Sequence, residues 1–279
     1  MPLEPEPEHD GERPLVRLEH AGPGVRILTL DRAVRLNALT DALVRALGAA
    51  LDEVAADRDC HCLVLTGAGR AFSAGLDLED YGDSERVATL GTPLAELERQ
   101  RELAALSLRL HRMPQTVVAA VNGPAAGGGF ALVCASDLRI AARSARFGVS
   151  FIRAGFSACD LGVSWLLPRL VGAARAHELM LTGRLFDADE AREIGLVLDV
   201  VDDDALLDAA LAKAAQVALN PPASVQLTKQ GMWLALEVPS LEAAIELENR
   251  QQVLAGLTAD RHEATAAFLE KRPPHYQHR

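Results

Sequence analysis

Positive charge is scarce in this chain. Its 279 residues include 28 lysines and arginines against 39 aspartates and glutamates, which gives a formal net charge of −11. Binding to nucleic acid depends on clustered basic side chains that neutralise phosphates, so the charge balance argues against that class of partner. A ligand that carries phosphate groups would have to be bound by local arginines or lysines, or by backbone N–H groups.

Cysteine is also scarce, and long apolar runs are absent. The four cysteines have neither the spacing of a disulfide framework nor that of a zinc site, so we expect buried free thiols and no metal. They are Cys60, Cys62, Cys134 and Cys159. No apolar run is long enough to cross a bilayer, and the acidic, proline-rich N-terminus is not a signal peptide. These features favour a cytoplasmic protein with no membrane partner.

Nucleotide-binding fingerprints are missing as well. Two stretches contain closely spaced glycines, Gly67–Gly69 and Gly127–Gly129. A dinucleotide-binding G-x-G-x-x-G motif would need a further glycine three positions later, where the chain has Phe72 and Leu132 instead. The phosphate-binding motif G-x-x-x-x-G-K-[ST] is also absent. The glycines therefore require another explanation.

The pattern of apolar residues predicts alternating strands and helices in the first two thirds of the chain. Strands are expected at 25–30, 61–66, 116–121, 138–141 and 196–201, and helices after Thr40, from Pro93 and over 130–135. A strand, a helix and a second strand in succession indicate a parallel sheet with a right-handed crossover.

The last third of the chain has a helical pattern throughout. We expect three regions: a disordered acidic and proline-rich tail at 1–14, an α/β core at 15–203, and a helical region at 204–279 used for packing and oligomerisation.

Three successive glycines at 127–129 stand where a helix is expected to begin. Glycines let the backbone approach a ligand closely, and the first N–H groups of a helix are unpaired and lie at the positive end of its dipole. This arrangement suits an oxygen that gains negative charge, such as that of a thioester enolate. An alternative is that the glycines serve only close packing of the helix on the sheet.

Several segments resemble the crotonase superfamily, the enoyl-CoA hydratase/isomerase family. The resemblance is strongest at Leu30–Leu39, Leu65–Asp77, Ala119–Leu132 and Ser136–Ile140, and it continues through 181–184, 188–197 and 267–272. The matching segments occur in the same order as in the family and together cover residues 15 to 272.

The resemblance implies a fold, a substrate and an assembly. The fold is α/β, a spiral of ββα repeats whose helical C-terminal region trimerises, which gives a homotrimer or a dimer of trimers. The substrate is an acyl-CoA thioester, and no cofactor is implied beyond the coenzyme A of that substrate. By analogy with the family, the backbone N–H groups of Leu76 and Gly128 polarise the thioester carbonyl.

The resemblance also implies positions that contact coenzyme A. These are Arg35, Leu36, Ala74 and Asp77, together with Phe268 and Lys271 from the same or a neighbouring subunit. Arg35 and Lys271 are the basic residues of this otherwise acidic protein that are expected to bind the phosphates of coenzyme A.

Two positions break the family pattern. Hydratases of the family carry two glutamates that activate water, and these align with Ala131 and Phe151 here, neither of which can transfer a proton. The segment 158–168 resembles that of dienoyl-CoA isomerases, which holds a proton-transferring aspartate at the position of Asp160. Desolvation in an apolar pocket would raise its pKa. An alternative is that Asp160 caps a helix beginning at Leu161.

These observations favour double-bond isomerisation of an enoyl-CoA through an enolate, with Asp160 transferring the proton. Hydrolysis of a CoA thioester, another lyase reaction, and an acyl-CoA binder without activity stay open as alternatives. Among other residues, Asp137 is interpreted as structural, His111 and Arg112 as partners of a helix dipole, and Arg153, Trp165 and Tyr81 as parts of the acyl pocket or its rim.

Overall fold

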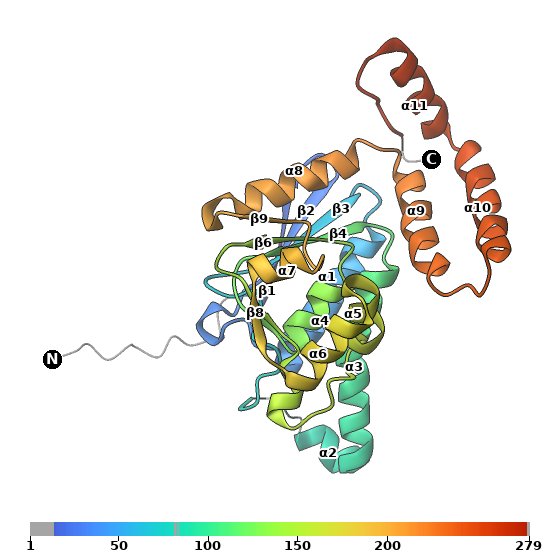
Figure 1. Ribbon diagram of the computed structural model, residues 1–279. Coiled ribbons are helices and arrows are strands. Elements are labelled where there is room, and N and C mark those ends of the chain that lie inside the picture. Colours follow the sequence, from blue (N-terminus) through green and yellow to red (C-terminus); the bar gives the residue numbers. More distant parts are fainter. Residues whose placement is uncertain (1–13, 81, 83, 278–279) are drawn as a thin grey trace.

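A six-stranded sheet forms the centre of the protein (Figure 1). The computed structural model describes residues 14–80, 82 and 84–277, so the expected tail, apart from residue 14, and Tyr81 lie outside the described residues. The strand order is β1-β2-β3-β4-β6-β9. Its strands are β1 (Val16–Gly22), β2 (Val25–Leu30), β3 (Cys62–Gly67), β4 (Thr116–Val121), β6 (Leu138–Ala142) and β9 (Asp199–Val201).

The strand directions agree with the sequence pattern. β1 pairs antiparallel with β2, and every later neighbour in this sheet is parallel. The predicted strand, helix and strand unit is confirmed, because α1 (Asp41–Ala56) connects the parallel strands β2 and β3. Thr40 caps α1 by accepting a hydrogen bond from the Leu43 N–H at 3.2 Å.

A second, three-stranded sheet carries the next part of the chain. It has the order β5-β7-β8 and consists of β5 (Ala125–Ala126), β7 (Arg146–Gly148) and β8 (Leu185–Asp187). The helices between the strands are α2 (Ser84–Leu90), α3 (Thr92–Arg112), α4 (Gly128–Ala135), α5 (Val163–Val171), α6 (Ala173–Thr182) and α7 (Ala188–Glu193). Short 3-10 helices lie at η1 (Ala33–Arg35), η2 (Ser150–Ala154) and η3 (Asp203–Ala205).

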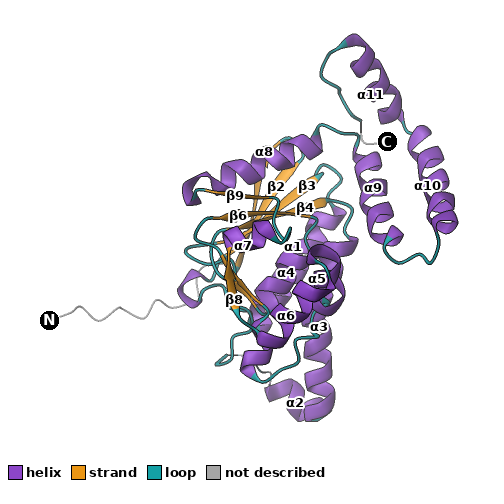
Figure 2. Ribbon diagram, in the orientation of Figure 1, coloured by secondary structure: helices purple, strands orange, loops and turns teal. Residues whose placement is uncertain are grey.

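Helices cover both faces of the central sheet (Figure 2). On one face, α1, α3 and α4 enclose the larger apolar core. On the other face, α8 (Leu206–Ala218) packs through Leu206, Ala210 and Ala214. The chain is helical from 206 onward, but α8 is part of the packed core rather than of the helices that leave it.

The helices after α8 lie to one side of the core (Figure 1). We call α9 (Pro222–Ala235), α10 (Leu241–Gly256) and α11 (Ala259–Glu270) the C-terminal arm. Large apolar side chains on the arm are exposed, including Leu241, Leu257 and Phe268. Burial of apolar surface drives association, so this exposure suits a region that meets another surface.

Two details differ from the sequence-based expectations, the length of one strand and the exposure of one cysteine. The strand expected at 196–201 is limited to β9, because the N–H groups of Leu196 and Val197 bond to the Ala191 carbonyl and end α7 instead. Cys60, Cys62 and Cys134 are buried free thiols as predicted, whereas Cys159 is exposed. No helix among the described residues is long and apolar enough to cross a membrane.

Candidate active site

Two loops meet at the carboxyl ends of the parallel strands β3 and β4. The loop at 72–77 follows β3 and the loop at 122–127 follows β4. Their backbones are hydrogen-bonded to each other, because the Ser73 N–H donates to the Pro124 carbonyl at 3.1 Å and the Ala126 N–H donates to the Ser73 carbonyl at 3.0 Å. The sheet therefore places the two glycine-bearing segments side by side.

Glycines allow the two loops to approach this closely. Gly75 has a φ of +89°, and a Cβ on it would lie 2.7 Å from the Ala126 carbonyl oxygen and 3.1 Å from the Gly128 nitrogen. A Cβ on Gly129 would collide with the Ser73 carbonyl oxygen. The packing role left open by the sequence is therefore present, and the same packing brings the Gly128 N–H against the Gly75 turn.

Two N–H groups in these loops lack acceptors. The Leu39 N–H bonds to the Gly75 carbonyl at 2.7 Å and the Asp77 N–H bonds to the Leu39 carbonyl at 3.1 Å, which leaves the Leu76 N–H between them unpaired. Gly128 is the first residue of α4, where N–H groups have no partner within the helix. Among the described residues, neither N–H has a hydrogen-bond acceptor.

Both groups border a pocket of about 440 Å³, which we call the Gly128 pocket. Its walls come from the two loops, from α3, from η2 and from the loop before α5. The apolar side chains among its lining residues are Leu76, Leu78, Leu103, Phe151 and Phe156, together with Ala74 and Ala154. A carbonyl group that enters this pocket can meet unpaired N–H donors in mostly apolar surroundings, where hydrogen bonds to a developing negative charge are strong.

Asp160 is one of two carboxylates that line the Gly128 pocket. Its Oδ1 accepts hydrogen bonds from Gln100 Nε2 at 2.5 Å and from the Leu161 N–H at 2.8 Å. Its Oδ2 has no hydrogen-bond partner among the described residues. The helix-cap interpretation is wrong in its simple form, because α5 begins at Val163 and its N-cap is Gly162. One oxygen is thus fixed and the other is free to accept a proton.

Glu96 is the second carboxylate in the pocket lining, and it is held differently. Arg99, whose side chain is almost fully buried, donates to Glu96 at 2.7 Å and also contacts Asp41 at 3.4 Å. Glu96 is therefore held by a cation, whereas Asp160 has no cationic partner among the ion pairs of the described residues.

The two positions that align with the hydratase glutamates lie near the pocket and carry no acid. Phe151 lines it, and its Cε1 atom lies 3.8 Å from where a Cβ on Gly127 would be. Ala131 is fully buried in α4. An aromatic ring therefore occupies part of the space beside the glycine turn.

Four of the residues expected to contact coenzyme A lie close to one another at the loop after β3. They are Arg35, Leu36, Ala74 and Asp77. The Ala74 N–H donates to the Leu36 carbonyl at 2.9 Å, and Leu36 has a φ of +53°. Asp77 is buried and accepts from Arg32 Nη1 at 2.6 Å. Arg35 is exposed and pairs with Glu79 and, at 3.5 Å, with Asp77.

Asp77 is a charged residue with a structural contact. Burial alone would raise the pKa of its carboxyl, but hydrogen bonds from Arg32 and from the N–H groups of Glu79 and Asp80 outweigh burial and hold that pKa below its ordinary value. The Asp77 carboxylate therefore fixes the loop.

Phe268 and Lys271 lie elsewhere in this chain. Both lie at the end of α11, which Figure 1 shows well away from α3 and α4. The Phe268 side chain is 83% exposed, and Lys271 ends the helix with a φ of +55°. One copy of the chain does not bring them to the site.

Three polar residues on α3 line the pocket without having been predicted from the sequence, namely Glu96, Arg99 and Gln100. Their spacing of three and four positions, continued by Leu103, places them on one face of the helix. That spacing indicates a common helix face, but many solvent-exposed helix faces show the same spacing. No cluster of three His, Cys, Asp or Glu side chains in the described parts of the chain is placed to hold a metal ion.

The family model named enoyl-CoA hydratase/isomerase matches residues 20–279. A probable enoyl-CoA hydratase of Mycobacterium tuberculosis is 43% identical over 261 residues, which are 93% of this chain and 92% of the relative. The 1,2-epoxyphenylacetyl-CoA isomerase of Escherichia coli is 41% identical over 260 residues, which are 93% of this chain and 97% of that enzyme.

Solved structures agree with these sequence matches. A probable enoyl-CoA hydratase/isomerase from Mycobacterium abscessus superimposes with a TM-score of 0.88 at 36% identity, covering 96% of this chain and all of that one. An enoyl-CoA hydratase from Bacillus anthracis gives the same TM-score at 33% identity, covering 95% of this chain and all of its own. The predicted fold class, a crotonase-like α/β core followed by helices, is confirmed.

Proposed function

This chain belongs to the enoyl-CoA hydratase/isomerase family, and we propose that this enzyme moves the double bond of an enoyl-CoA thioester. The observation that supports the proposal most directly is the shared pocket, in which two unpaired N–H groups, of Leu76 and Gly128, and the free Oδ2 of Asp160 occur together. An enolate mechanism needs both an acceptor for a proton and donors for the developing oxyanion.

The proposed role of the two N–H groups is to bind the thioester carbonyl oxygen. They belong to loops fixed by hydrogen bonds, so they need no rearrangement when the oxygen gains charge. The positive end of α4 adds to this effect at Gly128. Hydrogen bonds that strengthen as the charge grows lower the barrier to removing a proton next to the carbonyl.

The proposed proton transfer runs through Asp160. For a 3-enoyl thioester, its carboxylate removes a proton from C2, and the electron pair of that C–H bond moves into the C1–C2 bond while the carbonyl oxygen becomes an oxyanion. The oxyanion then collapses, the 3,4 double bond shifts to 2,3, and C4 takes the proton from Asp160. Gln100 and the Leu161 N–H hold Oδ1, which leaves Oδ2 for both transfers.

Hydration is the second candidate, because several relatives are named as hydratases and Glu96 supplies a second carboxylate at the pocket. The ion pair of Glu96 with Arg99 and the residues Ala131 and Phe151 at the hydratase positions favour isomerisation instead. Hydrolysis of the thioester, another lyase reaction and silent binding of acyl-CoA are the remaining alternatives.

We also propose how coenzyme A is bound. Its pantetheine and adenine parts would lie along Leu36, Ala74 and the Asp77 main chain, with Arg35 near a phosphate. Phe268 and Lys271 would come from the arm of a neighbouring subunit, which the exposure of Phe268 supports. A homotrimer or a dimer of trimers would provide such a neighbour.

The test compares turnover of a 3-enoyl-CoA and of crotonyl-CoA by the wild type and by Asp160→Asn. We expect isomerisation of the 3-enoyl thioester to exceed hydration, and kcat to fall by about 10²–10⁴ in the variant, because an amide cannot accept the proton. Asp199→Asn, on the exposed start of β9, is the matched control. Glu96→Gln shows whether the second carboxylate contributes.

Binding is measured separately, by the thermal shift that a saturated acyl-CoA produces, because a ligand of the native state stabilises it. Binding without turnover of either substrate would identify a silent binder. Full activity of Asp160→Asn would show that the proton is transferred by another group.

A further inference from the structure

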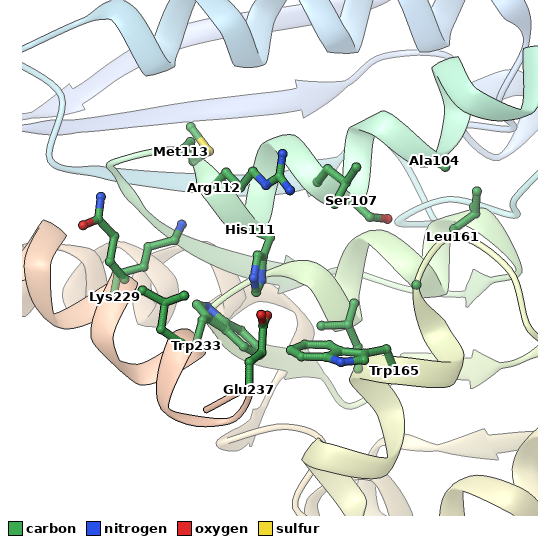
Figure 3. Close-up of a pocket in the computed structure, with 15 residues that line it drawn as sticks. Ala104, Ser107, His111, Arg112, Met113, Leu161, Trp165, Lys229, Trp233 and Glu237 are labelled. Carbon is green, nitrogen blue, oxygen red and sulfur yellow. The ribbon is translucent and has the colours of Figure 1, made fainter. Parts of the chain in front are cut away.

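A second pocket, of about 580 Å³, lies next to the Gly128 pocket. It is enclosed by α3, by the start of α5 and by α9 of the C-terminal arm (Figure 3). We call it the Trp pocket, because Trp165 from α5 and Trp233 from α9 line it with their rings 6.1 Å apart. Of its lining residues, the proposed mechanism uses only Leu161, through the backbone N–H that donates to Asp160 Oδ1.

The two pockets are consecutive along one face of α3. Residues 96, 99, 100 and 103 line the Gly128 pocket, and residues 104, 107, 108 and 111 line the Trp pocket. Positions 96, 100, 103, 104, 107 and 111 are related by spacings of three and four on one side of the helix, which rises about 1.5 Å per residue, and positions 99 and 108 flank that side. A chain that runs along α3 from the Gly128 turn would therefore point toward the Trp pocket.

Leu161 lies at the boundary. It lines the Trp pocket, while its neighbour Asp160 lines the Gly128 pocket. Its Cδ1 lies 3.5 Å from the position of a Cβ on Gly128. Leu161 has a φ of +47°, and a left-handed conformation costs a leucine roughly 1–2 kcal/mol. Such strain in a non-glycine residue is concentrated at functional sites.

The Trp pocket contains polar atoms without partners. Ser107 is 6% exposed, and its Oγ has no hydrogen-bond partner among the residues that the structure describes. A serine inside a helix can bond to the carbonyl four residues earlier, but Ser107 does not. The Nδ1 atom of His111 is also buried and has no partner within the described part of the chain. Leaving a buried polar group unpaired costs about 1–3 kcal/mol, so such atoms are rare unless a ligand or water pairs with them.

The His111 ring packs against both tryptophans, with its centroid 4.5 Å from that of Trp233 and 5.9 Å from that of Trp165 (Figure 3). Burial lowers the pKa of His111 and so favours the neutral ring, which has one nitrogen that donates and one that accepts. His111 lies in the last turn of α3, as expected for a partner of the helix dipole, but burial disfavours the charged form of its ring. A neutral imidazole and a hydroxyl are suited to a neutral polar group.

We infer that the Trp pocket receives the far end of the acyl group, and that the preferred acyl group ends in an aromatic ring carrying a hydroxyl. The ring would pack edge-to-face or offset against Trp165 and Trp233, and the hydroxyl would pair with Ser107 Oγ or His111 Nδ1. This inference rests on the proposed function, since it takes the thioester to lie at Gly128.

The test uses saturated thioesters, which bind without reacting. The probes are butanoyl-CoA, 4-phenylbutanoyl-CoA and 4-(4-hydroxyphenyl)butanoyl-CoA, with affinities measured by calorimetry. Trp165 and Trp233 are the only two tryptophans of the 279 residues, and both line this pocket, so tryptophan emission reports on it directly. We expect the hydroxyphenyl ester to bind at least tenfold more tightly than butanoyl-CoA and to change the emission.

Ser107→Ala tests the polar contact. We expect it to weaken the hydroxyphenyl ester roughly fivefold relative to the phenyl ester, the effect of one hydrogen bond. Ser164→Ala, an exposed serine on α5, is the control. Equal affinities for all three thioesters with unchanged emission would overturn the inference and leave the proposed function intact. Failure of every CoA thioester to bind would overturn the proposed function as well.

Discussion

Two contacts at the ends of the central strands hold distant segments of the chain together, and they differ in kind. At the Gly128 pocket, the loops after β3 and β4 meet through backbone atoms, and glycines at 75 and 129 leave no room for side chains. At the base of the C-terminal arm, α9 meets the core through the side chain of Lys229, which is 4% exposed. At the first contact, the N–H groups of Leu76 and Gly128 have no acceptor among the described residues and can bind a ligand. At the second contact, the Lys229 ammonium group already has acceptors for its hydrogens.

Lys229 has a complete set of partners. Its Nζ lies 2.8 Å from Asp137 Oδ2 and donates to the carbonyls of Leu110 at 2.9 Å and Gln115 at 2.8 Å. Asp137 also accepts from the Trp233 indole N–H and from the Val117 N–H. The predicted structural role of Asp137 is therefore confirmed, and the residue joins the arm to the start of β4.

The largest expected effect is the loss of this buried pair. Lys229→Met removes the cation and leaves the Asp137 carboxylate buried, which should lower the free energy of unfolding by about 3–5 kcal/mol. Urea unfolding of the variant, compared with Lys213→Met on the exposed surface of α8, measures this. A loss no greater than that of the control would mean that water replaces the ammonium group and that the arm is held by other contacts.

A substitution in the two loops should change the rate of the reaction more than the stability of the fold. In Gly75→Ala the new methyl would push against the Ala126 carbonyl and the Gly128 nitrogen, which moves one oxyanion donor. Loss of one such donor reduces kcat by about 10²–10³. Gly172→Ala is the matched control, because Gly172 has a similar φ of +80° but no atom within 4 Å of its Cβ position.

Steady-state kinetics on the 3-enoyl-CoA substrate compare the two glycine variants. Equal kcat values would show that the strain of a positive φ, not the displaced donor, governs the effect. A difference of the expected size, with similar melting temperatures, would support the role of the Gly128 N–H.

The contrast also explains which parts of the molecule could be predicted from the sequence. Strand and helix periods and the Thr40 cap are local signals, so β2, α1 and β3 follow from the residues themselves. The glycine turns at 75 and 128 were identifiable because few other residues fit them. Asp160 was found as an acid, but the helix it was expected to cap begins at Val163 instead.

The parts that could not be predicted depend on contacts between distant segments. Gln100 is 60 residues from Asp160, and Lys229 is 92 residues from Asp137. Nothing in the local sequence around Lys229 shows that it will be buried, because lysines are almost always exposed unless paired. The partners of Asp160 and Lys229 are therefore known only from the folded structure.

The smallest expected effect is the pH dependence of stability that His111 causes next to the C-terminal arm. Burial lowers the pKa of His111 below its ordinary value of 6.5, so between the two pKa values the unfolded chain binds the proton that the folded chain excludes. Stability therefore falls as the pH drops below about 6.5, and the effect is modest because the ring is only partly buried. His111→Gln should remove this part of the pH dependence, whereas His177→Gln, on the exposed surface of α6, should keep it. Urea unfolding at pH 7.5 and pH 5.5 measures the difference. If both variants lose stability equally on acidification, then His111 is protonated in the folded protein, and the neutral ring expected in the Trp pocket is absent at that pH.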